Sequence, residues 1–127
     1  MNERVPERCS GVPLLSEETS TPEAMVRVLE SAGIEMVFGM PGGDTIALFR
    51  ALYDHQDTIR TVLVREEAKA GVMAEVYGRL TGRPGVVIGQ GAFAVNANFG
   101  AIEAHMAASP MLILTDLSDN APFTLHA

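Results

Sequence analysis

Four short apolar runs alternate with stretches of helical composition along most of this chain. The runs are residues 35–38, 58–64, 85–89 and 110–115, and the helical stretches are residues 22–32, 44–53, 66–80 and 94–107. Near-continuous apolar strands joined by crossover helices are typical of a parallel sheet that is covered on both faces. The alternation therefore predicts an α/β fold, a parallel sheet with helices on both faces.

The first helical stretch has signals at both ends. Thr21 is a residue type favoured at the N-cap, Pro22 suits the first helical position, and Gly33 follows the last turn. The spacing i, i+3, i+4, i+7 predicts one buried face, which consists of Met25, Val28, Leu29 and Ala32. Residues 1–20 have no such period, so we expect a flexible N-terminal arm there and a single domain over residues 21–127.

The composition is that of a globular domain and excludes several classes of function. Apolar residues make up 47% of the 127 residues and charged residues 20%, which provides material for a hydrophobic core. The net charge is -7 and the basic residues are scattered singly, so neither nucleic acid nor an anionic membrane is an expected partner. The single cysteine and the lack of a signal-peptide pattern make the cytoplasm the expected location.

Three turns are candidates for a ligand site, because ligands of parallel sheets bind outside the carboxyl ends of the strands. They are residues 39–43, 65–67 and 89–96. Each also has a purely structural interpretation, since glycines permit tight turns and adjacent glutamates suit the first turn of a helix. Neither G-x-G-x-x-G nor Gly-Lys-Ser/Thr occurs, so no phosphate-binding fingerprint is present. No metal site is predicted, because the three histidines lack companion ligands at metal spacing.

Four motifs together resemble the N-terminal, pyrimidine-binding domain of thiamine diphosphate enzymes of the acetolactate synthase-like family. Residues 37–43 are similar to the family's V-F-G-x-P-G-G turn, and residues 65–68 to its R-H-E-x element. Residues 73–86 resemble M-A-x-G-Y-A-R-x-T-G-x-P-G-V, and residues 107–110 keep the spacing of its S-x-P element. The resemblance implies the family's α/β fold of the pyrimidine-binding type over residues 21–116.

The resemblance also implies a role for one carboxylate. Counting back from Tyr77 puts the family's cofactor-activating, catalytic glutamate at Glu67 and not at Glu66. In the family this carboxylate hydrogen-bonds to a ring nitrogen of the aminopyrimidine and so promotes removal of a proton from the thiazolium ring. The cofactor-binding positions implied in the same way are Pro41, Gly42, Gly43, Gly91 and Asn96.

The other half of such a site is implied to lie elsewhere. The family holds the diphosphate and its Mg²⁺ on a separate domain that carries Gly-Asp-Gly, a motif that this chain lacks. We therefore expect the cofactor-activating half of an enzyme acting on 2-oxo acids. It would be a fragment, or a subunit that needs a diphosphate-binding partner in a homo- or hetero-oligomer. We expect the fold to be incomplete at its C-terminal end and the chain alone to be inactive.

Two departures from the family pattern leave an alternative open. Glu66 stands where the family has histidine, and Gly91-Ala92-Phe93 stands where it has Gly-Pro-Gly. A ring at Phe93 restricts the approach of the backbone to a ligand, so the pocket is expected to differ there. The chain could instead be a non-catalytic binding or assembly module that keeps the fold, or an unrelated nucleotide-binding α/β domain.

Overall fold

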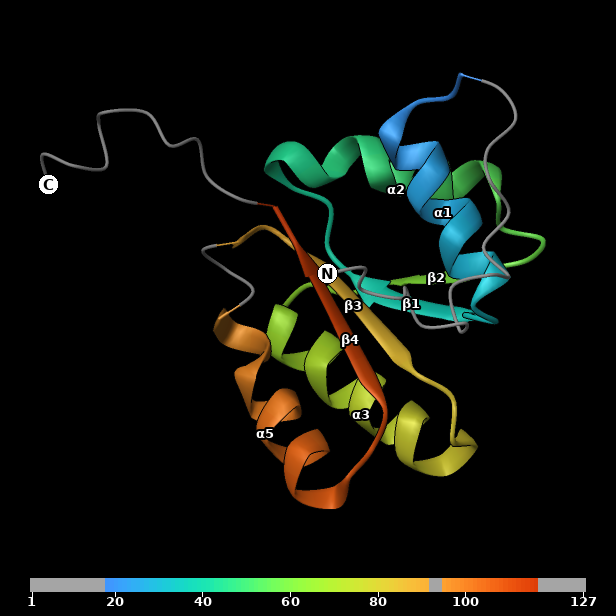
Figure 1. Cartoon of the computed structure of the whole chain (residues 1–127). Coiled ribbons are helices and arrows are strands. Elements are labelled where there is room, and N and C mark those ends of the chain that lie inside the picture. The colour runs from blue at the N-terminus through green and yellow to red at the C-terminus, as the bar shows by residue number, and fades with distance from the viewer. Residues whose placement is uncertain (1–17, 92–94, 117–127) are drawn as a thin grey trace, which may run out of the picture.

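The computed structural model describes residues 18–91 and 95–116 and contains a four-stranded parallel sheet (Figure 1). The strands stand in the order β2-β1-β3-β4 and span Arg60–Leu63 (β2), Met36–Gly39 (β1), Gly85–Gly89 (β3) and Met111–Thr115 (β4). The two central strands are paired with Val37 opposite Val86. All four strand predictions are confirmed to within two residues at each end.

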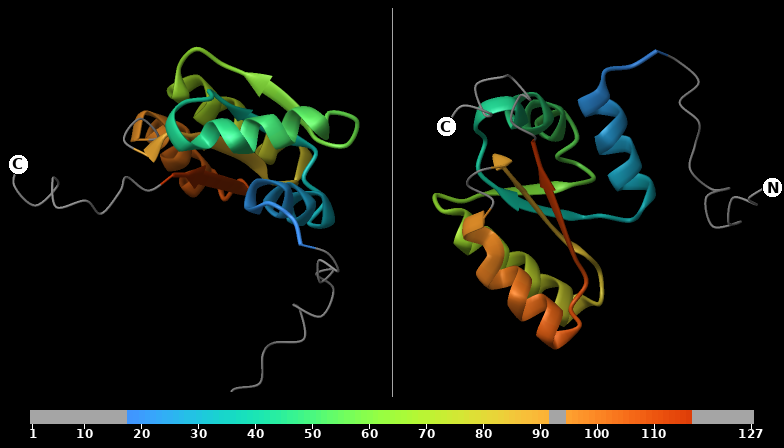
Figure 2. Two further views of the ribbon diagram at one scale, coloured as in Figure 1. Left: turned by 90° about the horizontal axis from the view of Figure 1, so that it is seen from above. Right: turned by 60° about the vertical axis from the view of Figure 1, so that its left-hand side comes forward.

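Helices cover both faces of this sheet, as the alternation of the sequence predicts. Helices α1 (Thr21–Ser31) and α2 (Ile46–Asp54) lie on one face, and α3 (Glu67–Thr81) and α5 (Asn98–Ala107) lie on the other. Short 3-10 turns precede two of them, η2 (Gly43–Thr45) before α2 and η3 (Val95–Ala97) before α5. Figure 2 shows the same two layers from two further directions.

The core consists of two apolar clusters, one on each face of the sheet, because successive strand residues point to opposite faces. Val37, Val86 and Ile88 pack with residues of α1 and α2. Phe38 and Val87 pack with residues of α3 and with Ala97 of η3. The central strands are therefore buried on both sides, which explains why β3 is apolar without alternation.

Two details of the first helix differ from the sequence prediction. The N-cap is Ser20, whose hydroxyl accepts a hydrogen bond from the backbone N–H of Glu23, and not Thr21. Val26 and Leu29 are buried, whereas Val28 is 46% exposed and Ala32, also predicted on the buried face, is exposed. Val28 instead borders an apolar groove of about 350 Å³ between α1 and Leu112 and Leu114 of the edge strand β4. The predicted N-terminal arm falls almost wholly outside the described residues.

The helices over residues 18–91 and 95–116 include none that is long and apolar enough to cross a membrane.

Candidate functional site

The strand order creates a crevice between the carboxyl ends of β1 and β3. After β1 the chain turns through η2 into α2 on one face, and after β3 it turns through η3 into α5 on the other. Open α/β sheets bind ligands where two adjacent parallel strands end and the chain continues from one to each face of the sheet. Strands β1 and β3 meet this condition. The strand order, which sequence reasoning left open, thus places the turns after residues 39 and 89 side by side.

Glu67 reaches this edge from a third turn. It is the first residue of α3, which connects β2 to β3 and packs across β1 and β3 on the way. The side chain of Glu67 is beside Gly89 at the end of β3, where a Cβ on the glycine would lie 3.6 Å from Cγ of Glu67. Glu67 is only 7% exposed. Within the described residues, its carboxylate forms no hydrogen bond or ion pair.

Two other glutamates of the same helix region are in different situations. Glu66 is the N-cap residue of α3, has a side chain that is 63% exposed, and pairs with Lys69 at 3.3 Å. Glu75 is 2% exposed, but its carboxylate accepts hydrogen bonds from the Ser109 hydroxyl at 3.0 Å and from Arg79 at 3.1 Å. Glu75 therefore links α3 to the loop before β4, and Glu67 is the buried acid that is left available for a ligand.

The turn after β1 is shaped by contact with the turn after β3. Gly43 has a φ of +51°, a conformation that side chains other than glycine rarely adopt. A Cβ there would also lie 2.8 Å from Nε2 of Gln90, and one on Gly42 would lie 3.5 Å from Oε1 of the same side chain. The Gln90 carboxamide therefore spans the two glycines. Pro41 precedes them and is exposed.

The end of β4 completes this edge. The backbone N–H of Gly91 donates a hydrogen bond to the Asp116 carboxylate. A Cβ on Gly91 would lie 2.6 Å from the Asp116 carbonyl oxygen, so only glycine fits there. The other carboxylate oxygen of Asp116 lies 3.3 Å from the position of a Cβ on Gly43. Asp116 therefore touches both glycine turns.

Asn96 lies in η3, at the start of the connection to α5, and is exposed. Its neighbour Ala97 is fully buried against α3, where a Cβ on Gly71 would lie 2.6 Å from the Ala97 carbonyl oxygen. Gly71 comes one helical turn after Glu67. Asn96 and Glu67 therefore belong to neighbouring segments of the same layer. The predicted departures at Ala92 and Phe93 lie outside the described residues.

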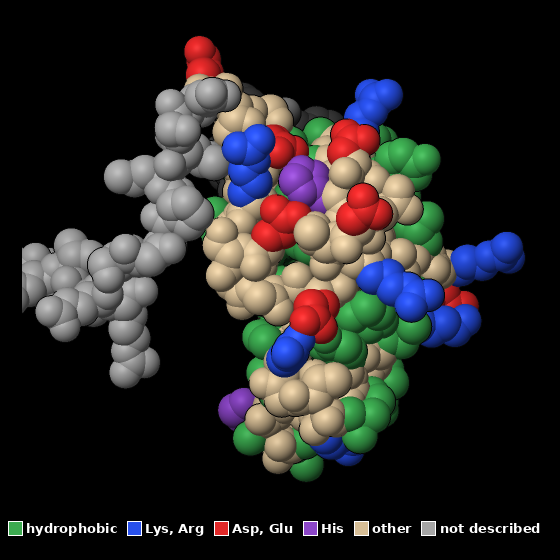
Figure 3. All heavy atoms as spheres, turned by 90° about the vertical axis from the view of Figure 1, so that its right-hand side faces the viewer, with side chains coloured by type: hydrophobic (Ala, Val, Ile, Leu, Met, Phe, Trp, Pro, Cys, Tyr) green, Lys and Arg blue, Asp and Glu red, His purple; other side chains and the backbone are tan. Residues whose placement is uncertain are grey.

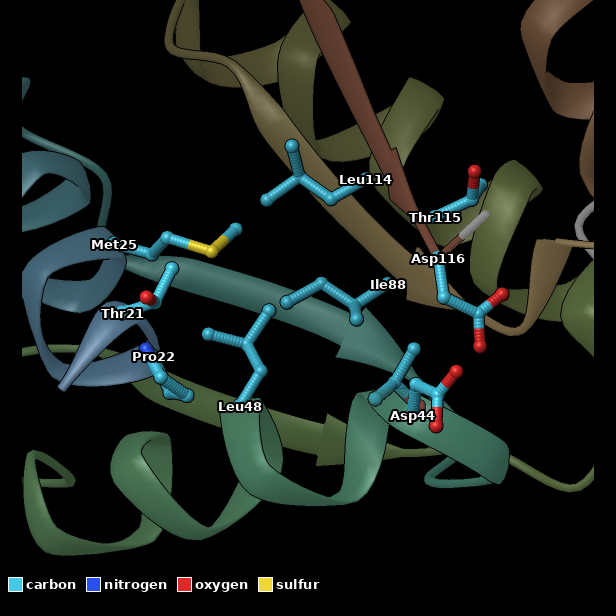
Figure 4. Close-up of a pocket in the computed structure, with 10 residues that line it drawn as sticks. Thr21, Pro22, Met25, Asp44, Leu48, Ile88, Leu114, Thr115 and Asp116 are labelled. Atoms are coloured by element: carbon cyan, nitrogen blue, oxygen red, sulfur yellow. The ribbon is translucent and has the colours of Figure 1, made fainter. Parts of the chain in front are cut away.

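A cavity of about 230 Å³ opens at the same edge on the α1 and α2 side (Figure 4). Its apolar walls include Met25, Leu48 and Ile88, and its polar end carries Asp44 and Asp116. Sequence reasoning missed Gln90, Asp44 and Asp116. Inspecting the residues that follow every predicted strand, including the last, would have found Asp116.

The whole described fold matches a family model with the description "Thiamine pyrophosphate enzyme, N-terminal TPP binding domain", over residues 19–121. The chain belongs to this family. The match includes all four strands and every predicted site residue. It confirms the family assignment and the fold class that the sequence motifs indicated.

The relatives of this chain include a protein named as a decarboxylase and proteins named as acetolactate synthases. The chain is 36% identical over 114 residues to the probable 2-ketoarginine decarboxylase AruI of Pseudomonas aeruginosa, covering 87% of this chain and 20% of that protein. It is 42% identical over 94 residues to the probable acetolactate synthase large subunit of Methanococcus aeolicus, covering 73% and 15%. It is 33% identical over 102 residues to the acetolactate synthase large subunit of Lactococcus lactis, covering 80% and 18%. The chain thus spans a fifth or less of the length of these relatives.

Proposed function

We propose that this chain is the cofactor-activating half of a thiamine diphosphate-dependent enzyme that acts on 2-oxo acids. The observation that carries the proposal is Glu67. Glu67 is only 7% exposed at the switch point of the sheet, lies beside the glycine backbone at the end of β3, and forms no hydrogen bond or ion pair among the described residues. Its carboxylate is therefore available to accept a hydrogen bond from a ligand at this edge of the sheet.

The aminopyrimidine ring of thiamine diphosphate fits the chemistry of this position. A ring nitrogen that carries a proton is a suitable hydrogen-bond donor to a carboxylate. Glu67 would hold that proton, and the first turn of α3 would orient the carboxylate. When bound, the cofactor supplies a nucleophilic carbon that adds to the carbonyl group of a 2-oxo acid.

The glycine turns are suited to line the same ring. Gly42 and Gly43 present backbone without side chains next to Gln90, and Gly91 does so next to Asp116. We assign Gly42, Gly43 and Gly91 to contacts with the cofactor on this basis, and Pro41 and Asn96 because they are exposed in the connections that follow β1 and β3. Their role would be to admit a flat ring close to the backbone, and backbone N–H groups there can donate hydrogen bonds.

The diphosphate and Mg²⁺ would be held by another domain, of the same or another chain. The described residues hold no group of three or more metal-ligating side chains. A partner is supported by α5, which is apolar on two opposite sides. Gly100 and Ala104 are buried against α3, whereas the opposite stripe of η3 and α5 is 58–77% exposed and consists of Val95, Phe99, Ile102 and Met106. An exposed apolar stripe opposite the buried side of a helix is typical of a protein–protein contact, so we assign this stripe to the partner domain.

The substrate class follows from the names of the relatives. The name of the 2-ketoarginine decarboxylase specifies a 2-oxo acid as the compound that is decarboxylated. A 2-oxo acid is therefore the substrate class that we propose for the complete enzyme, and release of its carboxylate as carbon dioxide is the step that we propose for it.

The test is Glu67→Gln in the complete enzyme, read by exchange of the C2 proton of bound thiamine diphosphate with deuterium. We expect exchange to slow by about 10²–10⁴-fold, the usual contribution of a positioned acid–base group. The matched control is Glu66→Gln, which changes the exposed neighbouring acid and should leave the rate within about threefold of the wild type. Equal exchange rates in the wild type and Glu67→Gln would disprove the assignment.

A further inference from the structure

The imidazole of His55 lies between two carboxylates of α1. Its Nδ1 is 2.9 Å from Glu30 and its Nε2 is 3.1 Å from Glu23. His55 directly follows α2, and the two glutamates are seven residues apart, two turns along one side of α1. The ring therefore joins the end of α2 to both halves of α1. Figure 3 shows the face on which acidic side chains surround a histidine.

Proton counting constrains the state of this ring. An ionised carboxylate only accepts hydrogen bonds, and a neutral imidazole has one N–H to donate. Both contacts can therefore be hydrogen bonds only when the imidazole carries two protons and a positive charge. The hydrogen bond to Glu30, with that to Glu23, raises the pKa of His55 above its usual 6.5 despite some desolvation.

The surrounding groups favour the same charge state. The Thr58 hydroxyl donates to Glu30, and Arg27 donates to Glu23 at 2.8 Å. These two bonds, each with a further contribution from His55, hold the pKa of both glutamates below the usual 4.5. Asp54 and Asp57 flank His55 in the sequence. When His55 is protonated, the carboxylates of Glu23 and Glu30 are balanced by the cations of Arg27 and His55. When His55 is neutral, these groups carry one uncompensated negative charge.

The cluster is connected to the edge of the sheet through the first turn of α1. Glu23 lies between Pro22 and Met25, and these two residues together with Thr21 form one wall of the cavity at the carboxyl ends of the strands (Figure 4). If α1 moves relative to α2, the part of the cavity wall that α1 forms therefore moves with it.

We propose that the doubly protonated imidazole of His55 is a clasp that fixes α1 against α2, and that its deprotonation loosens α1 and the cavity wall formed by Thr21, Pro22 and Met25. The clasp is closed at mildly acidic pH and opens as the pH rises. It makes the geometry of this cavity responsive to pH through a group that has no contact with Glu67.

The direction of the effect follows from linkage. A group whose pKa is higher in the folded than in the unfolded state contributes stability that is fully present below the unfolded value, here 6.5. That contribution is lost as the pH rises through the folded-state pKa. The carboxylates contribute in the opposite sense, and their stabilisation is present above 4.5 and lost as the pH falls through their folded-state pKa values. The clasp is therefore complete in the interval between these limits.

The first measurement is an NMR titration of the wild-type, 127-residue chain. We expect the Cε1–H signal of His55 to titrate above pH 6.5 and the methyl signal of Met25 to follow the same curve. Amide-exchange protection factors in α1 should fall severalfold between pH 6 and pH 8.5, because exchange protection reports local opening. A His55 that titrates below 6.5, or a Met25 signal that does not follow it, would overturn the proposal.

The second measurement compares His55→Gln with the matched control His105→Gln. Glutamine can still donate one hydrogen bond but does not titrate, so His55→Gln should abolish the pH-dependent fall in α1 protection. His105 is exposed on α5 and its replacement should leave that fall unchanged. An unchanged fall in His55→Gln would assign the pH dependence to another group. If His55→Gln does not fold, Glu30→Gln should lower the titration midpoint of His55, and an unaltered midpoint would contradict the clasp.

Discussion

On one face of the sheet α3 and α5 meet through their backbones, whereas on the other the end of α2 meets α1 through charged side chains. Gly100 lies directly on the backbone of Gly71, so closely that no side chain fits between the two helices. The layer that carries Glu67 is thus set by sterics. The layer that walls the cavity is tied instead by His55 and the two glutamates of α1. Glu67 thus lies in the layer whose two helices are held by a backbone contact, whereas the two helices of the opposite layer are joined through ionisable side chains.

The largest expected effect comes from filling the glycine contact. In Gly100→Ala the new methyl group overlaps the backbone of Gly71, which cannot move without separating α3 from α5. We expect the free energy of unfolding to fall by about 3 kcal/mol, the upper end of the usual cost of overpacking. Urea denaturation of the wild type and of Gly100→Ala measures this difference in the free energy of unfolding.

Gly42→Ala is the matched control for that substitution. Its backbone is extended, with a φ of -173°, and the nearest atom to a new Cβ is the Gln90 side chain at 3.5 Å. The cost should be below about 1 kcal/mol, since no backbone atom is displaced. Comparable losses in the two variants would show that α3 and α5 are not held by a fixed backbone contact.

A smaller effect is expected at the buried Glu75. Ser109→Ala removes the hydroxyl that donates to Glu75 and leaves that carboxylate oxygen buried without its partner. The expected loss is about 1–3 kcal/mol in the free energy of unfolding, the cost of an unsatisfied buried acceptor. Lys69→Gln breaks only the exposed pair with Glu66 and should cost less than about 1 kcal/mol. If denaturation gave the reverse order, the rigidity of this layer would not depend on the buried network.

Much of this arrangement could be predicted from local sequence signals. Apolar runs located each strand, and the family resemblance, counted from Tyr77, pointed to Glu67, whose role toward the cofactor stays a prediction, and not to Glu66. The strand order could not be predicted, because it depends on the faces to which the connections cross, and no local pattern encodes that choice. The prediction failed at Val28 for a related reason. Helical spacing indicates one apolar side of α1, but β4 is an edge strand and leaves part of that side uncovered.

The charged cluster was equally hidden from sequence reasoning. His55, Glu23 and Glu30 are separated by up to 32 residues, so no spacing rule connects them. Only the packing of α1 beside α2 brings the three side chains together. Long-range polar contacts of this kind are specified by tertiary structure, whereas caps and glycine turns are specified by neighbours in the chain.

The smallest expected effect is a loss of amide-exchange protection in α1, relative to α5, at acidic pH. The carboxylates of Glu23 and Glu30 have lowered pKa values, chiefly through hydrogen bonds from Arg27 and Thr58, so their stabilisation is present above 4.5 and lost as the pH falls through the folded-state values. Amide-exchange protection in α1 should therefore decline between pH 5.5 and pH 3.5 by more than protection in α5, whose contact with Gly71 contains no ionisable group. Glu30→Gln should reduce the decline in α1 and leave α5 as it is. Parallel decline of both helices would mean that acid opens the domain as a unit, and the distinction between a steric layer and a titratable layer would be lost.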